Sequence, residues 1–177
     1  MSSVVALALA LWAQDVTNYA SYFGGNFQEV ASVAKSDADG NFFVGGTSSS
    51  TGAPFDEGPS EPGRTLGFIA KFSPDGRKIW AKRLPVAEVR QMAISPFGEV
   101  VLTGRSVPGA LEATEGVFQA SQRNGGLYIL KMNGEGEILW ATYFGNAGLI
   151  TATSLSISPS GRVAICGFAF LSDLPRP

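Results

Sequence analysis

The sequence predicts an all-β fold, and more specifically a partial β-propeller built of four-stranded antiparallel blades. The first observation is an aromatic segment that recurs at a spacing of about 60 residues, which is typical of repeat architectures. The second is a four-residue turn ending in glycine that recurs between short apolar segments. The third is the lack of a sustained apolar period of 3.6 residues, which predicts little or no helix.

The aromatic segment is clearest at residues 140–146 (WATYFGN), with an earlier copy at 19–26 and a diverged copy from Trp80 onward. We interpret it as the outermost strand of one blade and the connection to the next. Tyr19, Trp80 and Trp140 hold the same place in each copy. A carbohydrate-stacking platform is one interpretation of these rings, but recurring aromatics favour packing because they bury a large area.

Strands are expected in a regular order along the chain, because β-branched and aromatic residues alternate between turn residues. The expected strands are 17–23, 30–36, 41–46, 66–72, 77–84, 89–94, 99–104, 126–132, 137–144, 151–157 and 162–168. Two long loops, 47–65 and 105–125, separate the second strand of a unit from the third. The unit is therefore strand, hairpin, strand, long loop, strand, hairpin, strand, which corresponds to one propeller blade.

Each short turn ends in a glycine that we expect to adopt positive φ, since a type I turn followed by such a residue is a favoured hairpin connection. These glycines are Gly40, Gly76, Gly98, Gly136 and Gly161. Apolar residues two apart recur in phase between the copies, which predicts packing between successive blades. The matching positions are Phe42, Val100 and Val163, followed by Val44, Leu102 and Ile165.

The predicted organisation leaves blades incomplete. Residues 29–84 and 87–144 each form a blade, 150–177 form a truncated half blade, and 17–28 supply an outer strand whose own blade is missing. Propellers close with about four to eight blades, and repeats need matching or capping ends. The expected partners are therefore further blades, supplied by a longer chain or by other protomers.

Residues 1–13 contain an apolar run from Val4 to Ala13, followed by the polar Gln14 and Asp15. This is typical of a secretory signal, although the first basic residue is Lys35. The alternative is an upstream strand. The run is too short to span a bilayer. We expect an extracytoplasmic, secreted or cell-surface protein.

The composition excludes or disfavours several classes of function. The net charge of −2 gives no electrostatic footprint for nucleic acid. Histidine is absent, which removes the commonest general base and metal ligand. Cys166 is the single cysteine. It lies in an apolar run, so we expect a buried, inert thiol. No cofactor is expected.

Two groups of acidic residues are candidate sites. Asp37 and Asp39 precede Gly40 in a pattern that resembles a cation-binding loop. Turn formation is favoured instead, because the equivalent turns at 95–98 and 158–161 lack carboxylates. The long loops carry the candidate ligand-facing residues Phe55, Asp56, Glu57, Glu115 and Phe118. Carboxylates there could perform acid–base chemistry, but nothing in the pattern fixes their spacing, so a solvated loop is favoured.

Three segments together carry a resemblance to a known family: 68–76 (FIAKFSPDG), 22–25 (YFGG) and 39–46 (DGNFFVGG), joined by 114–119 (TEGVFQ) in the second long loop. They resemble the SBBP family of bacterial β-propeller repeats over about residues 17–170. The departures are Leu84-Pro85-Val86 after an aromatic strand and Gly134 at a turn proline position. The resemblance implies a secreted or surface protein with a scaffold or binding role and no shared catalytic residues.

The expected function is thus a non-enzymatic propeller segment that acts as a scaffold or binds a protein or carbohydrate ligand. One alternative is part of a propeller enzyme, a hydrolase or lyase whose site needs missing blades. Another is a protomer that completes a propeller by self-assembly.

Overall fold

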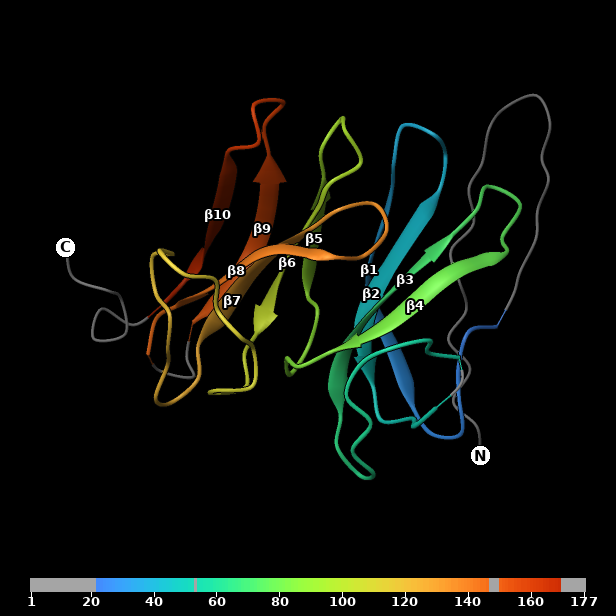
Figure 1. The fold of residues 1–177 in the computed structure, drawn as a ribbon, viewed down its shortest axis with the longest axis horizontal. Coiled ribbons are helices and arrows are strands. Elements are labelled where there is room, and N and C mark those ends of the chain that lie inside the picture. The colour runs from blue at the N-terminus through green and yellow to red at the C-terminus, as the bar shows by residue number, and fades with distance from the viewer. Residues whose placement is uncertain (1–21, 53, 147–149, 170–177) are drawn as a thin grey trace.

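The computed structural model describes residues 22–52, 54–146 and 150–169. The regular secondary structure in these ranges consists of β-strands, without helices (Figure 1). The strands are β1 (Glu29–Ser36), β2 (Phe42–Ser48), β3 (Leu66–Phe72), β4 (Lys78–Leu84), β5 (Gln91–Ile94), β6 (Val100–Arg105), β7 (Leu127–Met132), β8 (Ile138–Phe144), β9 (Thr151–Ile157) and β10 (Val163–Phe168). The predicted all-β class is confirmed for these residues. None of them forms a helix long and apolar enough to cross a membrane.

The strands form three antiparallel sheets in simple up-and-down order. Sheet 1 has the order β1-β2-β3-β4, sheet 2 has β5-β6-β7-β8, and sheet 3 has β9-β10. Within the described ranges no sheet closes on itself. Every strand predicted from residue 30 onward is present. The expected strand at 17–23 and the segment 1–13 lie mostly or wholly outside the described residues, as does Tyr19.

The five short turns share one geometry, as their sequences predict. Their final glycines all have φ between 79° and 82°, and each donates its backbone N–H to the carbonyl three residues earlier, for example Gly98 to Ser95. The first turn residue then donates to the residue after the glycine, as Ser95 does to Glu99 at 2.8 Å. All five turns are therefore flanked by a strand pair six residues apart, such as Ile94 and Val100. In β3–β4 and β7–β8 the register shifts directly beyond that pair.

Successive residues of a strand point to opposite faces of its sheet and so pack in different apolar clusters. Phe43 and Ile69 of sheet 1 belong to the same buried cluster as Leu102 and Leu130 of sheet 2. The next residue along β2, Val44, instead packs with Phe23 on the other face of sheet 1. This large cluster between sheets 1 and 2 is the main core of the molecule.

The positions predicted to be equivalent keep the same orientation in all three sheets. Val44 faces the Phe23 cluster, Leu102 faces sheet 1, and Ile165 faces sheet 2 through a cluster that contains Leu127 and Ile150. Each sheet thus packs on the one before it with the same face. The predicted phase of the apolar repeat is confirmed.

A close backbone contact also repeats. Gly46, Gly104 and Gly167 each lie six residues after an equivalent turn glycine. A Cβ at these positions would lie 1.9, 2.3 and 2.0 Å from the carbonyl oxygens of Val30, Glu88 and Thr151, respectively. In each sheet, therefore, only glycine can occupy this position of the second strand, because the backbone near the start of the first strand lies so close to it.

The first strands of the three sheets lie in sequence across the molecule. β5 contacts both β1 and β9, and Figure 1 shows the three sheets side by side. The turns that join β1 to β2, β5 to β6 and β9 to β10 point to one end of the molecule, and the long loops 49–65 and 106–126 lie toward the other. We call the latter the loop end.

Candidate functional site

The first long loop runs along the outer edge of β4. The backbone N–H of Asp56 donates to Ala81 O at 2.8 Å, and Ala81 N–H donates back to Asp56 Oδ2 at 2.8 Å. Asp56 Oδ1 also accepts from Lys78 Nζ at 2.7 Å, and this contact holds the pKa of the Asp56 carboxyl below its usual value. Asp56 therefore docks the loop on the strand.

The second long loop repeats this arrangement with different residues. Thr114 N–H donates to Ala141 O at 3.0 Å, and Ala141 N–H donates to Thr114 Oγ1 at 3.0 Å. Farther along, Tyr143 N–H donates to Gln119 O at 2.9 Å. Thr114 takes this role in the second loop, where its hydroxyl accepts the bond that the Asp56 carboxylate accepts in the first. Sequence comparison misses the pair because the side chains differ.

Two other candidate residues of the first loop, Glu57 and Phe55, contact sheet 1. Glu57 pairs with Lys82 at 3.1 Å between Oε2 and Nζ. Phe55 packs against Phe23 and Phe68, with ring centroids 5.6 and 5.7 Å away, so it covers the Phe23 cluster.

Glu115 and Phe118 of the second long loop are also exposed. Glu115 is exposed, and Phe118 is 71% exposed while it stacks on Phe144 at 6.0 Å. Asp56 and Glu57 are exposed as well, but each is paired with a lysine. Glu115 and Phe118 are the exposed members of the five that make no ion pair with the described residues.

Arg83 is a buried charge that the sequence interpretation did not single out. It is 3% exposed, and its Nη2 donates to Arg64 O at 3.1 Å and to Ser48 O at 3.4 Å. Burial lowers the pKa of the Arg83 guanidinium, whereas the charges of Glu61 and Glu29 act in the opposite direction. Arg83 fixes the end of the first loop against sheet 1.

In sheet 2, Tyr143 holds the position that Arg83 holds in sheet 1. The Tyr143 hydroxyl donates to Leu111 O at 2.7 Å and accepts from Leu111 N–H at 3.0 Å. Both side chains therefore anchor a long loop through its backbone. A guanidinium and a phenol perform the same task, which explains why no sequence motif marked it.

The Asp37–Asp39 turn is organised by its own hydrogen bonds. Asp37 Oδ1 accepts from Asp39 N at 3.0 Å and Asn41 N at 2.8 Å, and its Oδ2 accepts from Asn41 Nδ2 at 2.8 Å. The nearest cation is Lys71, whose Nζ lies 4.0 Å from Asp37 Oδ2. Among the described residues no group of three or more potential metal ligands occurs. The carboxylate of Asp37 is thus occupied by turn contacts.

The two tryptophans among the described residues differ in whether a neighbouring sheet packs against them. Trp80 packs at the sheet 1–sheet 2 core, with its ring 6.0 Å from that of Phe43. Its Nε1–H donates to Gly134 O of the next sheet at 3.2 Å. Trp140 holds the equivalent place in sheet 2, but it lines an open groove.

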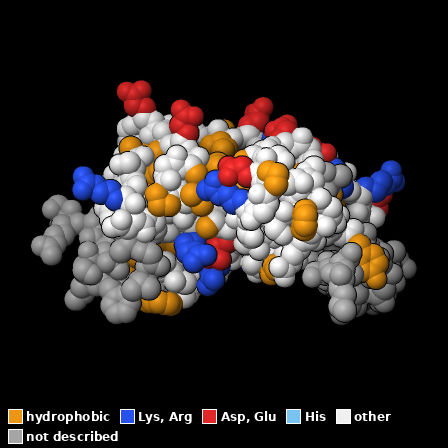
Figure 2. All heavy atoms as spheres, turned by 90° about the horizontal axis from the view of Figure 1, so that it is seen from below, with side chains coloured by type: hydrophobic (Ala, Val, Ile, Leu, Met, Phe, Trp, Pro, Cys, Tyr) orange, Lys and Arg blue, Asp and Glu red, His pale blue; other side chains and the backbone are white. Residues whose placement is uncertain are grey.

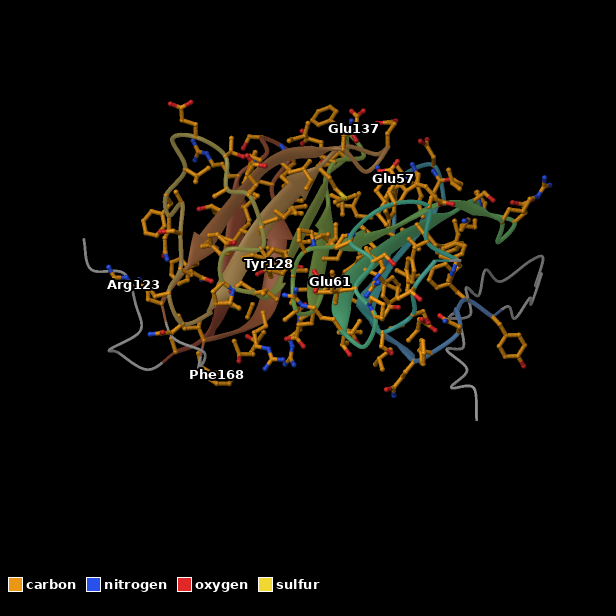
Figure 3. All side chains as sticks on the ribbon, turned by 60° about the horizontal axis from the view of Figure 1, so that its bottom comes forward. Glu57, Glu61, Arg123, Tyr128, Glu137 and Phe168 are labelled. Atoms are coloured by element: carbon orange, nitrogen blue, oxygen red, sulfur yellow. The ribbon has the colours of Figure 1, made fainter. Side chains whose placement is uncertain are left out.

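That groove, with a volume of about 680 Å³, lies between sheets 2 and 3. One wall is formed by β7 and β8, the other by β9 and β10. Its lining is mainly apolar and includes Ile129, Trp140, Phe144, Val163 and Ile165. We call it the apolar groove. Figure 3 shows Phe168, which also lines it, at the end of the molecule away from Glu137.

Cys166 corrects one expectation: its side chain is exposed, not buried. Its equivalents in the earlier sheets, Gly45 and Thr103, are both buried. Each is covered by the sheet that follows, and no sheet among the described residues follows sheet 3. The apolar run around Cys166 correctly indicates a strand, but local sequence does not show what covers its outward face.

A second, polar pocket of about 210 Å³ lies between sheets 2 and 3 beside the start of β9. It is lined by Glu88, Arg90 and Arg105, with Thr151. Arg90 pairs with Glu88 at 3.0 Å, whereas Arg105 is exposed and makes no ion pair with the described residues. Figure 2, which views the molecule from below, shows basic side chains beside acidic ones near the middle of that face.

The described residues thus form an all-β protein of repeated antiparallel sheets with docked loops, and its surface includes an apolar groove and a small polar pocket. Compared with models of known protein families and with curated proteins, the sequence matches none.

Proposed function

We propose that this chain is a segment of a β-propeller that serves as a non-enzymatic scaffold or ligand-binding module outside the cytoplasm. The observation that carries the proposal is the repeated packing of each sheet on the one before it. Equivalent residues face the same way in all three sheets, and the first strands lie in sequence. Sheets related in this way form a ring when enough of them follow one another.

The resemblance to SBBP repeats supports the scaffold role, as does the way polar side chains hold the long loops in place. Gln122 Nε2 donates to Leu127 O at 2.9 Å and to Phe144 O at 3.1 Å. Loops fixed by such contacts present a pre-formed surface, which lowers the entropic cost of binding. The signal-like residues 1–13 and the resemblance support an extracytoplasmic location.

The ligand surface we propose is the loop end, where Glu115 and Phe118 are exposed and Arg105 borders the polar pocket. A protein or carbohydrate that carries carboxylate groups fits this surface, because a guanidinium binds carboxylate through two parallel hydrogen bonds.

An array of neutral and acidic oligosaccharides tests this proposal on the full chain. We expect binding to acidic members, weakened by Arg105→Ala and unchanged by Arg162→Ala, which alters an exposed arginine in the turn region. Equal binding by both variants would refute the proposed surface. Hydrolase or lyase activity that is lost on substitution of Asp56, Glu57 or Glu115 would refute the non-enzymatic assignment.

A further inference from the structure

The second long loop contains a short segment that the first long loop lacks. In the first loop, the adjacent residues Asp56 and Glu57 both form backbone hydrogen bonds with β4. In the second loop, the equivalent bonds with β8 are made by Thr114 and Gln119. Residues 115–118 therefore have no counterpart between the two docking points of the first loop, and the repeated fold does not require them.

This extra segment ends on a firmly held residue, Gln119. Its Nε2 donates to Gly145 O at 3.0 Å and to Ser121 O at 2.8 Å, while its Oε1 accepts from Gly145 N–H at 3.0 Å. Its backbone N–H donates to Thr142 Oγ1 at 3.1 Å. These contacts fix the base of the preceding residue, Phe118, and a side chain held in advance loses less entropy when a ligand binds.

The ring of Phe118 has one face available to a ligand. It stacks on Phe144, with ring centroids 6.0 Å apart and 24° between the ring planes, and Phe118 nevertheless remains 71% exposed. The face of an aromatic ring carries partial negative charge. Such a face attracts the C–H groups that line the flat side of a sugar ring.

Arg105 lies on the same face of sheet 2 as Phe144 and at the same end. Arg105 is paired with Leu127, and Leu127 with Phe144, and directly opposite residues of antiparallel strands share a face of the sheet. The α-carbons of Arg105 and Phe144 are thus separated by two strand spacings, about 10 Å. An oligosaccharide of two or more rings can therefore contact both the guanidinium and Phe118.

Sheet 1 provides an internal comparison, because the row equivalent to Arg105, Leu127 and Phe144 consists of Thr47, Gly67 and Leu84. That row is tightly covered: Leu84 is 3% exposed, and a Cβ on Gly67 would lie 2.6 Å from Cγ2 of Val86. It contains neither a charge nor an aromatic ring. The fold therefore requires neither at this place, and the exposed Arg105 and Phe118 call for another explanation.

We propose that Phe118 is the stacking platform for a neutral sugar ring in an acidic oligosaccharide whose carboxylate binds Arg105. The proposal rests on the function proposed above and names carbohydrate as its ligand. Glu115, in the same short segment, is exposed and repels a second carboxylate, so the ring on Phe118 is neutral. An open ring face also lacks the enclosing pocket that the anchor residue of a protein ligand fills.

Calorimetric titration of the full chain with hyaluronan oligosaccharides, in which glucuronate alternates with N-acetylglucosamine, tests this platform. We expect Phe118→Ala to weaken binding about tenfold. Phe118→Tyr should bind as wild type does, and Phe118→Leu should resemble Phe118→Ala, because the contact needs an aromatic face. Phe97→Ala is the matched control, since Phe97 is 80% exposed and lies in the β5–β6 turn at the opposite end from the long loops.

A second probe separates the two contacts. Oligogalacturonate carries a carboxylate on every ring, so its binding should weaken in Arg105→Ala and change little in Phe118→Ala. If Phe118→Ala and Phe97→Ala bind hyaluronan equally while Arg105→Ala binds it less, the platform is wrong and the proposed loop-end surface stands. If Arg105→Ala has no effect, or if acidic peptides bind and no oligosaccharide does, both this inference and the carbohydrate surface fail.

Saturation-transfer NMR identifies the sugar ring in contact with the protein. Irradiation of the aromatic protons of the chain should transfer more magnetisation to N-acetylglucosamine than to glucuronate, and Phe118→Leu should remove this difference. Preferential transfer to glucuronate, or a preference unchanged in Phe118→Leu, would overturn the assignment. Thermal unfolding followed by circular dichroism should be the same for wild type and the Phe118 variants, because the ring is largely exposed.

Discussion

The α-carbon of Gly104 lies so close to the carbonyl oxygen of Glu88 that a Cβ at residue 104 would be 2.3 Å from that oxygen. The obstructing atom belongs to the backbone, so no side-chain rotation relieves the clash. We predict that Gly104→Ala lowers the free energy of unfolding by about 3 kcal/mol, the upper part of the usual range for overpacking. Urea denaturation followed by circular dichroism measures this change.

Gly134→Ala is the matched control, because Gly134 does not have positive φ and a Cβ there would have its nearest neighbours at an ordinary 3.6 Å. It should change stability little. If Gly104→Ala is no more destabilising than Gly134→Ala, the repeated close contact does not constrain the fold.

The Tyr143 hydroxyl should contribute to stability through both of its bonds to Leu111. Tyr143→Phe leaves the buried Leu111 N–H and carbonyl oxygen without these partners, and an unsatisfied buried polar group costs about 1–3 kcal/mol. We therefore predict a loss of about 2 kcal/mol and faster proteolysis within residues 106–126. Tyr22→Phe is the control, because Tyr22 is 78% exposed. Equal stability of both variants would contradict the anchoring role.

Stability should fall at alkaline pH because of buried phenols. Burial raises the pKa of Tyr128 well above 10.0, and burial likewise raises that of Tyr143. The unfolded chain then loses these protons at lower pH than the folded chain, so the stabilisation is complete below about pH 10 and decreases above it. Urea denaturation from about pH 8 to pH 11 should show this decrease.

Tyr128→Phe should reduce the slope of that decrease, and Tyr22→Phe should leave it unchanged. The comparison removes the contribution of lysines, which titrate in the same range. A slope that Tyr128→Phe does not alter would show that its phenol has no part in the alkaline transition.

Asp56 should control how firmly the first loop holds to β4. Asp56→Ala removes the acceptor for Ala81 N–H and the pair with Lys78, and we predict a loss of about 1–2 kcal/mol together with faster proteolysis in residues 49–65. The pKa of Asp56 is lowered in the folded state. Its stabilisation is therefore present above the ordinary value near 3.8 and is lost as pH falls through the folded value.

Hydrogen exchange at Ala81 measures this docking directly, and Ala141 provides the matched control because Thr114 does not titrate. Exchange at Ala81, but not at Ala141, should quicken in Asp56→Ala. Equal protection of Ala81 in wild type and variant would show that the carboxylate does not dock the loop.

The strands and turns could be predicted because their signals are local. Gly98 follows Ser95-Pro96-Phe97, and that short segment alone specifies a hairpin with positive φ. The alternation of Val100 and Leu102 likewise specifies one face of a strand. Phe43 is buried because the sheets stack in the order that the repeat predicts.

The loop contacts could not be predicted, because they join residues distant in sequence with no shared chemistry. Asp56 and Thr114 perform the same docking, and Arg83 and Tyr143 perform the same anchoring. The exposure of Cys166 depends on a neighbouring sheet and not on its own strand. Contacts between residues so distant in sequence leave neither a periodic pattern nor a short motif in the sequence.

The long loops have a consequence for solubility. By running along β4 and β8, they occupy backbone groups that would otherwise offer a template to another chain. Among the described residues β10 has no such cover, and an uncovered strand edge favours edge-to-edge aggregation. Aggregation of the isolated chain should therefore begin at β10, and a lysine at a position of β10 that faces outward would slow it without changing the core.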